Sequence, residues 1–193
     1  MMDYIESYLS SLRTISQELN INSVVEMVNI LEDSRDNDGR LFILGVGGSA
    51  ANASHAVNDF RKICGIETYA PTDNIAELTA RTNDNGWDTV FEDWLKVSKL
   101  NSRDTVMVFS VSGGNEFVSQ NIVKALNYAM EMGSYILGIV GKDGGYTAKM
   151  ISGYGYGAIL IIPTIDKELI TPLVESYHSI IWHLIVNHPK LKL

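Results

Sequence analysis

The 193-residue sequence has one cysteine, Cys64, only four prolines and fewer basic than acidic residues. A single cysteine excludes an intrachain disulfide, which is typical of a protein kept in a reducing compartment. The 15 basic and 23 acidic residues give a net charge of −8. This balance argues against a general surface for nucleic acids or anionic membranes, although it leaves room for a small local anion site.

The sequence also lacks a long apolar run and a recognisable leader. Its first residues, MMDYIESYLSSL, are acidic and contain no basic stretch followed by an apolar core, so we expect no signal peptide. No apolar run reaches the roughly 18 residues of a membrane span. These features predict a cytoplasmic protein without a membrane partner.

The remaining composition is that of a globular chain, with 46% apolar and 20% charged residues. The length suits one domain, and no linker interrupts it. We therefore expect a single domain over residues 1–193, with N-terminal helices in 1–36 and a core of strands and helices in 39–188.

Short apolar runs alternate with helical patterns along this core. Continuous apolar runs predict strands buried on both faces, and apolar residues three and four apart predict helices. The expected strands lie in 39–45, 66–70, 104–115, 134–141 and 157–163. The expected helices are 3–19, 22–34, 49–63, 88–98, 117–132 and 170–187, with short helical segments inside 71–88 and after 141. This alternation predicts βαβ units and a parallel sheet.

Two of the expected strands run into glycine and serine. Gly47, Gly48 and Ser49 follow the first strand, and Ser110 and Ser112 repeat the pattern at another strand end. Ligands of open α/β sheets bind at such carboxyl ends, where glycines admit a ligand and a helix N-terminus attracts an anion. Without a Walker lysine or a full G-x-G-x-x-G, the pattern favours a sugar phosphate over a nucleotide. A tight turn without a ligand is the alternative.

Four stretches in this order resemble the sugar isomerase (SIS) domain family: GVGGSAANASH, LTARTNDNGWDTVF, FSVSGGN and GIVGKDGG. They most resemble its phosphoheptose isomerase branch, which converts sedoheptulose 7-phosphate to D-glycero-D-manno-heptose 7-phosphate. The resemblance covers about residues 39 to 186. It implies a three-layer, flavodoxin-like α/β/α fold with two added N-terminal helices. It also implies a homotetramer with active sites between subunits.

The resemblance assigns substrate-binding positions in this chain. The family's phosphate-binding serines fall on Ser49, Ser110 and Ser112. Other positions fall beside the phosphate or where the family lines the sugar pocket. The full expected set is Gly47, Gly48, Ser49, Thr72, Asp73, Ser110, Ser112 and Asn115.

Histidines and carboxylates on two expected helices form a second candidate group. His55 and Asp59 are four residues apart and share a helix face. Glu175 and His183 are eight apart, which is about 80° around a helix axis, so their directions converge. These four side chains could bind a Zn²⁺-type ion. A surface hydrogen bond between His55 and Asp59 is the alternative reading.

The resemblance implies a metal site of His, Glu, Gln and His at these places. His55 matches the first histidine and His183 the last, which is the proposed base. Asp59 stands where the family has a catalytic glutamate, Glu175 where it has glutamine, and Val46 where it typically has asparagine. These departures suggest a shifted substrate or a member that has lost the reaction.

The expected activity is aldose–ketose isomerisation through an enediol. His183 would act as the base, Asp59 as the second proton carrier and a divalent metal, most simply zinc, as the electrophile. The alternative is a non-catalytic SIS protein that binds a sugar phosphate or a protein partner as a regulator or scaffold.

Overall fold

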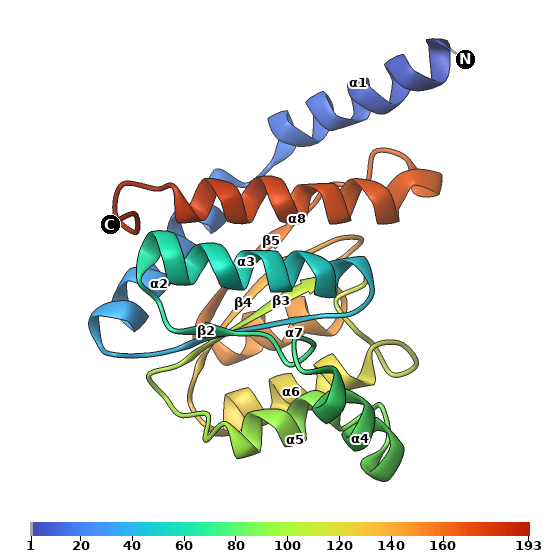
Figure 1. Ribbon diagram of the computed structural model, residues 1–193. Coiled ribbons are helices and arrows are strands. Elements are labelled where there is room, and N and C mark those ends of the chain that lie inside the picture. The colour runs from blue at the N-terminus through green and yellow to red at the C-terminus, as the bar shows by residue number, and fades with distance from the viewer. Residues whose placement is uncertain (1) are drawn as a thin grey trace.

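Five parallel strands form one sheet in the order β2-β1-β3-β4-β5. The computed structural model describes residues 2–193 (Figure 1). The strands are β1 (Leu41–Gly45), β2 (Thr68–Tyr69), β3 (Thr105–Ser110), β4 (Tyr135–Val140) and β5 (Gly157–Ile161). This is the flavodoxin-like strand order, and it confirms the predicted parallel α/β sheet.

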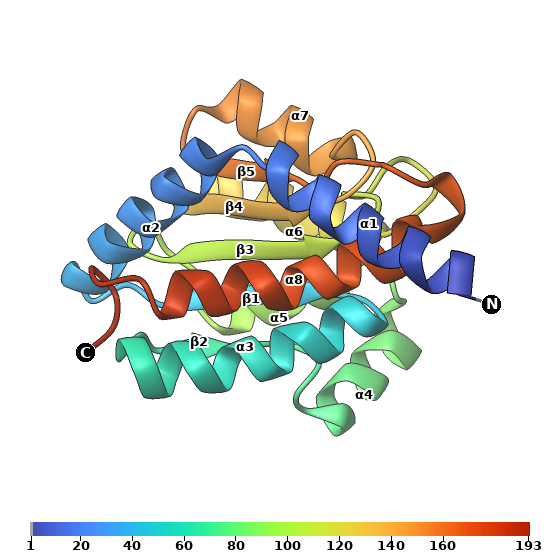
Figure 2. The same cartoon turned by 90° about the horizontal axis from the view of Figure 1, so that it is seen from above.

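Helices cover both faces of the sheet and complete the three layers (Figure 2). One layer contains α1 (Met2–Glu18), α2 (Ile21–Asp36), α3 (Gly48–Cys64) and α8 (Ile170–Val186). The short helix η1 (Lys167–Leu169) comes directly before α8. The other contains α4 (Ile75–Asn85), α5 (Val90–Val97), α6 (Gln120–Glu131) and α7 (Gly145–Tyr154). Both added N-terminal helices are present as expected, and α3 and α8 lie side by side.

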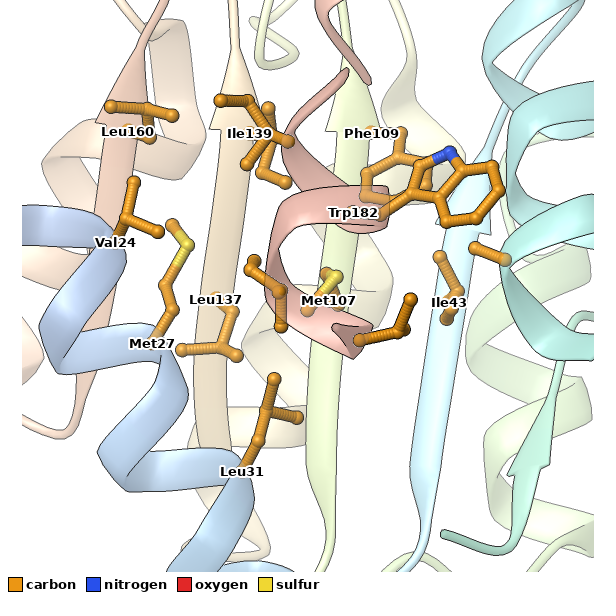
Figure 3. Close-up of a cluster of buried hydrophobic side chains, with 14 of the residues drawn as sticks. Val24, Met27, Leu31, Ile43, Met107, Phe109, Leu137, Ile139, Leu160 and Trp182 are labelled. Carbon is orange, nitrogen blue, oxygen red and sulfur yellow. The ribbon is translucent and has the colours of Figure 1, made fainter. Parts of the chain in front are cut away.

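Two hydrophobic clusters, one on each face of the sheet, hold the layers together. Strands β1, β3 and β4 contribute to both clusters, because successive side chains of a strand point to opposite faces of the sheet. Ile43 and Met107 belong to the cluster under α2, α3 and α8, whereas Leu44 and Val108 belong to the cluster under α5 and α6. Figure 3 shows side chains of α2 and Trp182 of α8 packed on the first of these faces. Burial on both faces explains why these strands read as continuous apolar runs.

Several element boundaries differ from the sequence expectation. The strand expected over 66–70 is only Thr68–Tyr69, and the strand expected over 157–163 ends at Ile161. The polar segment 71–88 contains an eleven-residue helix, α4. This helix buries no side chain and begins where the Asn74 Oδ1 atom accepts from the Glu77 N–H, so capping rather than apolar periodicity marks its start.

Helix α8 crosses the middle of the helical layer. Together with η1 it forms a stretch, Lys167–Val186, that is long and apolar enough to cross a membrane by length and composition. A core helix passes the same test, and α8 buries Tyr177, Ile181 and Trp182 against the sheet. Its other side carries the half-exposed residues Ile180 and Leu184.

Candidate functional site

A pocket of about 240 Å³ opens where β1 and β3 end at the same edge of the sheet. Its polar lining consists of Ser49, Ser110, Ser112, Ser119, Lys142 and Glu175. The three serines expected from the sequence therefore share one pocket, which we call the serine pocket. It lies at the switch point of the strand order, where ligands of such sheets bind.

The serine hydroxyls keep their protons available to a ligand. Ser110 Oγ accepts from the Gly113 N–H at 3.0 Å, and Ser112 Oγ accepts from the Gly114 N–H at 3.3 Å. Each hydroxyl uses a lone pair in these bonds, so its O–H can still donate to an anion. Ser49 contributes from the first turn of α3, where it is only 2% exposed.

Gly47 and Gly48 shape the start of α3. Gly47, the N-cap, has φ +62°, a conformation that glycine adopts without strain. Within residues 2–193 no side chain caps this helix, so the first turn presents free N–H groups. A Cβ added at Gly48 would lie 2.5 Å from a carboxylate oxygen of Glu175, so the Glu175 side chain lies directly over this glycine.

The remaining expected substrate residues do not line the serine pocket. Asn115 Oδ1 accepts from the N–H groups of Phe117 and Val118 and so closes its own loop, beside a separate polar pocket. Asp73 accepts a hydrogen bond from Ser54 of α3. Thr72 Oγ1 is buried, and the described chain provides no hydrogen-bond partner for it. Asp73 therefore lies beside α3, next to the second group of candidate residues.

His55, Asp59 and His183 come together between α3 and α8, and we call them the His–Asp–His cluster. One possible ligand atom from each lies within 4.8 Å of the other two. His183 Nε2 is 3.8 Å from Asp59 Oδ2, and the two imidazole rings are perpendicular with centroids 5.5 Å apart. His55 also packs edge-on against Trp182, with centroids 4.7 Å apart.

The backbone orients the His183 ring. Its Nδ1 atom lies 2.7 Å from the Ser179 carbonyl oxygen, which can only accept, so Nδ1 carries the proton. In the neutral ring, Nε2 then holds the lone pair and faces Asp59. A histidine held this way is ready to ligate a metal or to take up a proton.

Glu175, the fourth expected ligand, does not join the cluster within this chain. It lies eight residues before His183, so about 12 Å of helical rise separates them along α8. Glu175 and His183 project in similar directions around the helix axis, as expected. However, the Glu175 side chain lies over Gly48 and lines the serine pocket.

The donor set of the cluster fits a metal ion. Two imidazole nitrogens and one carboxylate oxygen are a combination that zinc accepts, and catalytic zinc sites use three protein ligands with one open position. His55 and His183 are exposed, so an ion and a substrate can both reach the cluster.

The cluster and the serine pocket share α3 and α8. Ser49 and His55 are six residues apart on α3, which corresponds to about 9 Å along the axis. This separation is comparable with the length of an extended seven-carbon sugar phosphate. Two residues that line the serine pocket, Ser119 and Lys142, were not expected from the sequence. A signal was present for Lys142, because it lies in GKDGG, a glycine-rich segment at the end of a buried strand.

Comparison with known proteins gives the family of this chain. A family model described as the SIS domain matches residues 3–141. A phosphoheptose isomerase from Geotalea daltonii is 31% identical over 188 residues, covering 95% of this chain and 90% of that protein. Another from Geobacter sulfurreducens is 30% identical over 195 residues, covering 97% and 96%.

The fold is shared with a solved structure at lower identity. Phosphoheptose isomerase GmhA from Neisseria gonorrhoeae aligns with a TM-score of 0.83, over 96% of this chain and 97% of that chain. The two sequences are 23% identical, so this likeness establishes the common fold alone.

Proposed function

Because this chain belongs to the SIS domain family and, within it, to the phosphoheptose isomerases, we propose that it converts sedoheptulose 7-phosphate to D-glycero-D-manno-heptose 7-phosphate. The observation that carries this proposal is the pairing of a serine pocket with a His–Asp–His cluster on the same two helices. One group suits the phosphate end of the substrate, and the other suits the carbons that exchange a proton.

The serine pocket holds the phosphate. Ser49, Ser110 and Ser112 donate their hydroxyl protons to it, and the first turn of α3 adds N–H groups and the positive end of a helix dipole. Of the two expected contacts to the sugar hydroxyls, we retain Asp73, because the Thr72 hydroxyl oxygen is buried. Fixing the phosphate holds C1 and C2 in place, which lowers the entropic part of the barrier.

The proton transfer falls to His183 and Asp59. Isomerisation removes a proton from one carbon and returns it to the neighbour, while the hydroxyl protons are also relocated. His183 Nε2 carries the lone pair and is the base of our scheme, and Asp59 is the second proton carrier. One lone pair cannot hold a metal and a proton at the same time. When His183 serves as a ligand, proton transfer would therefore fall to Asp59, whose two carboxylate oxygens allow one to bind the ion and the other to carry the proton.

The same three residues would hold one divalent metal, for which zinc fits the donor set. When bound, such an ion supplies positive charge to the developing enediolate oxygens. Glu175 is left out of this ligand set, because its side chain lies at the serine pocket. We also propose a cytoplasmic location and a homotetramer with active sites at the subunit contacts.

A non-catalytic sugar-phosphate-binding protein is the second candidate. The observation that favours it is Asp59, which is one methylene shorter than the glutamate that the resemblance implies. A shift of about 1.5 Å in a catalytic carboxylate can lower a rate about 10²-fold. Activity measurements separate the two candidates directly.

The test is an isomerase assay on purified protein with sedoheptulose 7-phosphate and shorter ketose phosphates. We expect an aldose product from the seven-carbon substrate, and no turnover by His183→Ala. That variant should still bind inorganic phosphate, because the base and the anchor are separate groups. Metal content, measured on protein purified without chelator, should be about one ion per chain and should fall in His183→Ala.

Two outcomes would count against this scheme. Phosphate binding without turnover of any ketose phosphate would support the non-catalytic candidate. Full activity in His183→Ala would remove that histidine from the mechanism. The matched control is His188→Ala, which changes a partly buried histidine beyond the end of α8, outside the cluster and the serine pocket, and should leave activity and metal content unchanged.

A further inference from the structure

Two charged side chains of opposite sign line the serine pocket. Lys142 follows β4, and Glu175 lies on α8. Over residues 2–193, neither enters an ion pair. Both charges are therefore available to a ligand.

Glu175 occupies the region where a phosphate is expected. A Cβ built on Gly48 would lie 2.5 Å from Glu175 Oε2 and 2.7 Å from Oε1, so the carboxylate sits directly over the first turn of α3. Asn52 Nδ2 donates to the Glu175 carbonyl at 3.0 Å and ties this turn of α8 to α3. The positive end of α3 attracts anions, so the carboxylate and a bound phosphate compete for it.

Lys142 is the one cationic side chain that lines this pocket in the described part of the chain. Its backbone has φ +52°, a left-handed conformation that is unfavourable for a residue with a side chain. The preceding Gly141 packs tightly, since an added Cβ there would lie 2.5 Å from Val174 and 2.8 Å from the Val111 carbonyl oxygen. Non-glycine residues held in this way cluster at functional sites.

We propose that Lys142 and Glu175 set the phosphate affinity of the serine pocket in opposite directions. Lys142 neutralises part of the phosphate charge, and Glu175 repels the phosphate and competes with it for the first turn of α3. This proposal rests on the proposed function in one respect, because it takes the ligand to be the phosphate of a sugar. Lys142 is then a phosphate-binding residue, and Glu175 is a residue that limits phosphate affinity. Glu175 also disfavours ligands that carry a second anionic group near the phosphate.

The test titrates inorganic phosphate into the full-length protein by calorimetry, which needs no isomerase activity. Lys142→Met should weaken phosphate binding about three- to tenfold, because it removes a charged partner of the anion. Glu175→Gln should strengthen binding by a similar factor, because it removes a like charge at nearly constant shape. The double variant should bind phosphate close to the wild-type affinity.

Three controls keep the result interpretable. Lys149→Met removes an equal charge from α7, outside the serine pocket, and should leave phosphate affinity unchanged. Lys142→Gly removes the same charge but relieves the left-handed backbone, so it should weaken phosphate binding while melting at or above the wild-type temperature. Glu175→Gln should keep the wild-type metal content, since its carboxylate lies away from the cluster.

The contradicting outcomes are distinct from those of the isomerase assay. Wild-type phosphate affinity in both Lys142 variants would overturn the role of the lysine, and unchanged or weaker binding in Glu175→Gln would overturn the role of the glutamate. Absence of measurable phosphate binding by the wild-type protein would overturn the whole proposal. If the variants behave as expected but no ketose phosphate is turned over, the charge balance stands and the proposed reaction falls.

Discussion

His178 lies on the buried face of α8, away from the exposed cluster histidines. Its ring stacks on Phe109 with centroids 5.1 Å apart, and its Nε2 atom donates to the Ile139 carbonyl at 3.0 Å. Burial lowers the pKa of His178 from 6.5 to about 4, and the hydrogen bond to Ile139 opposes this shift only in part. The folded protein therefore holds this histidine neutral where the unfolded chain already binds a proton.

The sign of the pH effect follows from this difference. The stability associated with neutral His178 is complete above pH 6.5 and is lost as the pH falls from 6.5 toward 4. Between pH 7 and pH 5 this residue alone should lower the free energy of unfolding by about 2 kcal/mol. Urea unfolding at both pH values should show this loss in the wild-type protein and a clearly smaller loss in His178→Gln.

The control for this prediction is His188→Gln, which changes a histidine that is only partly buried, beyond the end of α8. It should keep the wild-type pH dependence. If His178→Gln loses as much stability between pH 7 and pH 5 as the wild-type protein, another group is responsible for the acid sensitivity.

At the scale of elements, the turn from β1 into α3 forms the anion-binding end of the sheet. Gly45 ends β1, and a Cβ added there would lie 2.5 Å from the Ser49 carbonyl oxygen and 2.8 Å from the Ala50 nitrogen. Both are backbone atoms and cannot move without shifting the first turn of α3. Close approach of strand and helix therefore places Ser49 and the free N–H groups beside the ends of β1 and β3.

Gly45→Ala should lower the free energy of unfolding by about 1–3 kcal/mol, as overpacking in a dense region does. It should also weaken phosphate binding, because the first turn of α3 must shift. The matched control is Gly153→Ala on α7, where an added Cβ meets nothing within 4 Å. This control should raise stability by up to about 1 kcal/mol and leave phosphate affinity unchanged. Denaturant unfolding measures the first effect, and equal stability of the two variants would contradict the packing argument.

At the scale of the whole molecule, an apolar groove of about 430 Å³ runs between α1, α2 and α8 on the outer side of the helical layer. Its rim includes Ile21, Val25, Ile180 and Leu184, which are 72%, 50%, 46% and 49% exposed. Helix α1 lies apart from the sheet, on the outer side of α8, and buries only Ser11 and Ile15 (Figure 1). An apolar face of this extent marks a surface that a partner covers, and the proposed homotetramer supplies one.

Light scattering at micromolar protein should give four times the 21.3 kDa chain mass. The double variant Val25→Glu with Ile180→Glu should lower this mass, since it places charges in the apolar groove. The control Val97→Glu changes a residue that is 67% exposed on α5, in the opposite helical layer, and should leave the mass unchanged. A monomer mass for the wild-type protein would contradict the tetramer.

The sequence by itself determined the class of fold and most of the elements. Strands buried on both faces must be apolar throughout, so runs such as LFILG and TVMVF can be recognised locally. The serine and glycine residues were also readable, because they directly follow those strands. Helix α4 was not predicted in full, because its second half, TARTNDN, is polar and none of its side chains is buried.

Only the tertiary structure decided which candidate residues meet. His55 and Asp59 reach His183 because α3 packs against α8, and these helices lie more than 100 residues apart in the chain. The angle of Glu175 around its helix could be read from the sequence, but the packing of α8 on α3 places its side chain over Gly48, at the serine pocket. Lys142 joins the serine pocket because β4 pairs with β3 and ends at the same edge of the sheet. Strand pairing and helix packing bring together residues that are distant in sequence, and spacing along a single segment carries no information about such contacts.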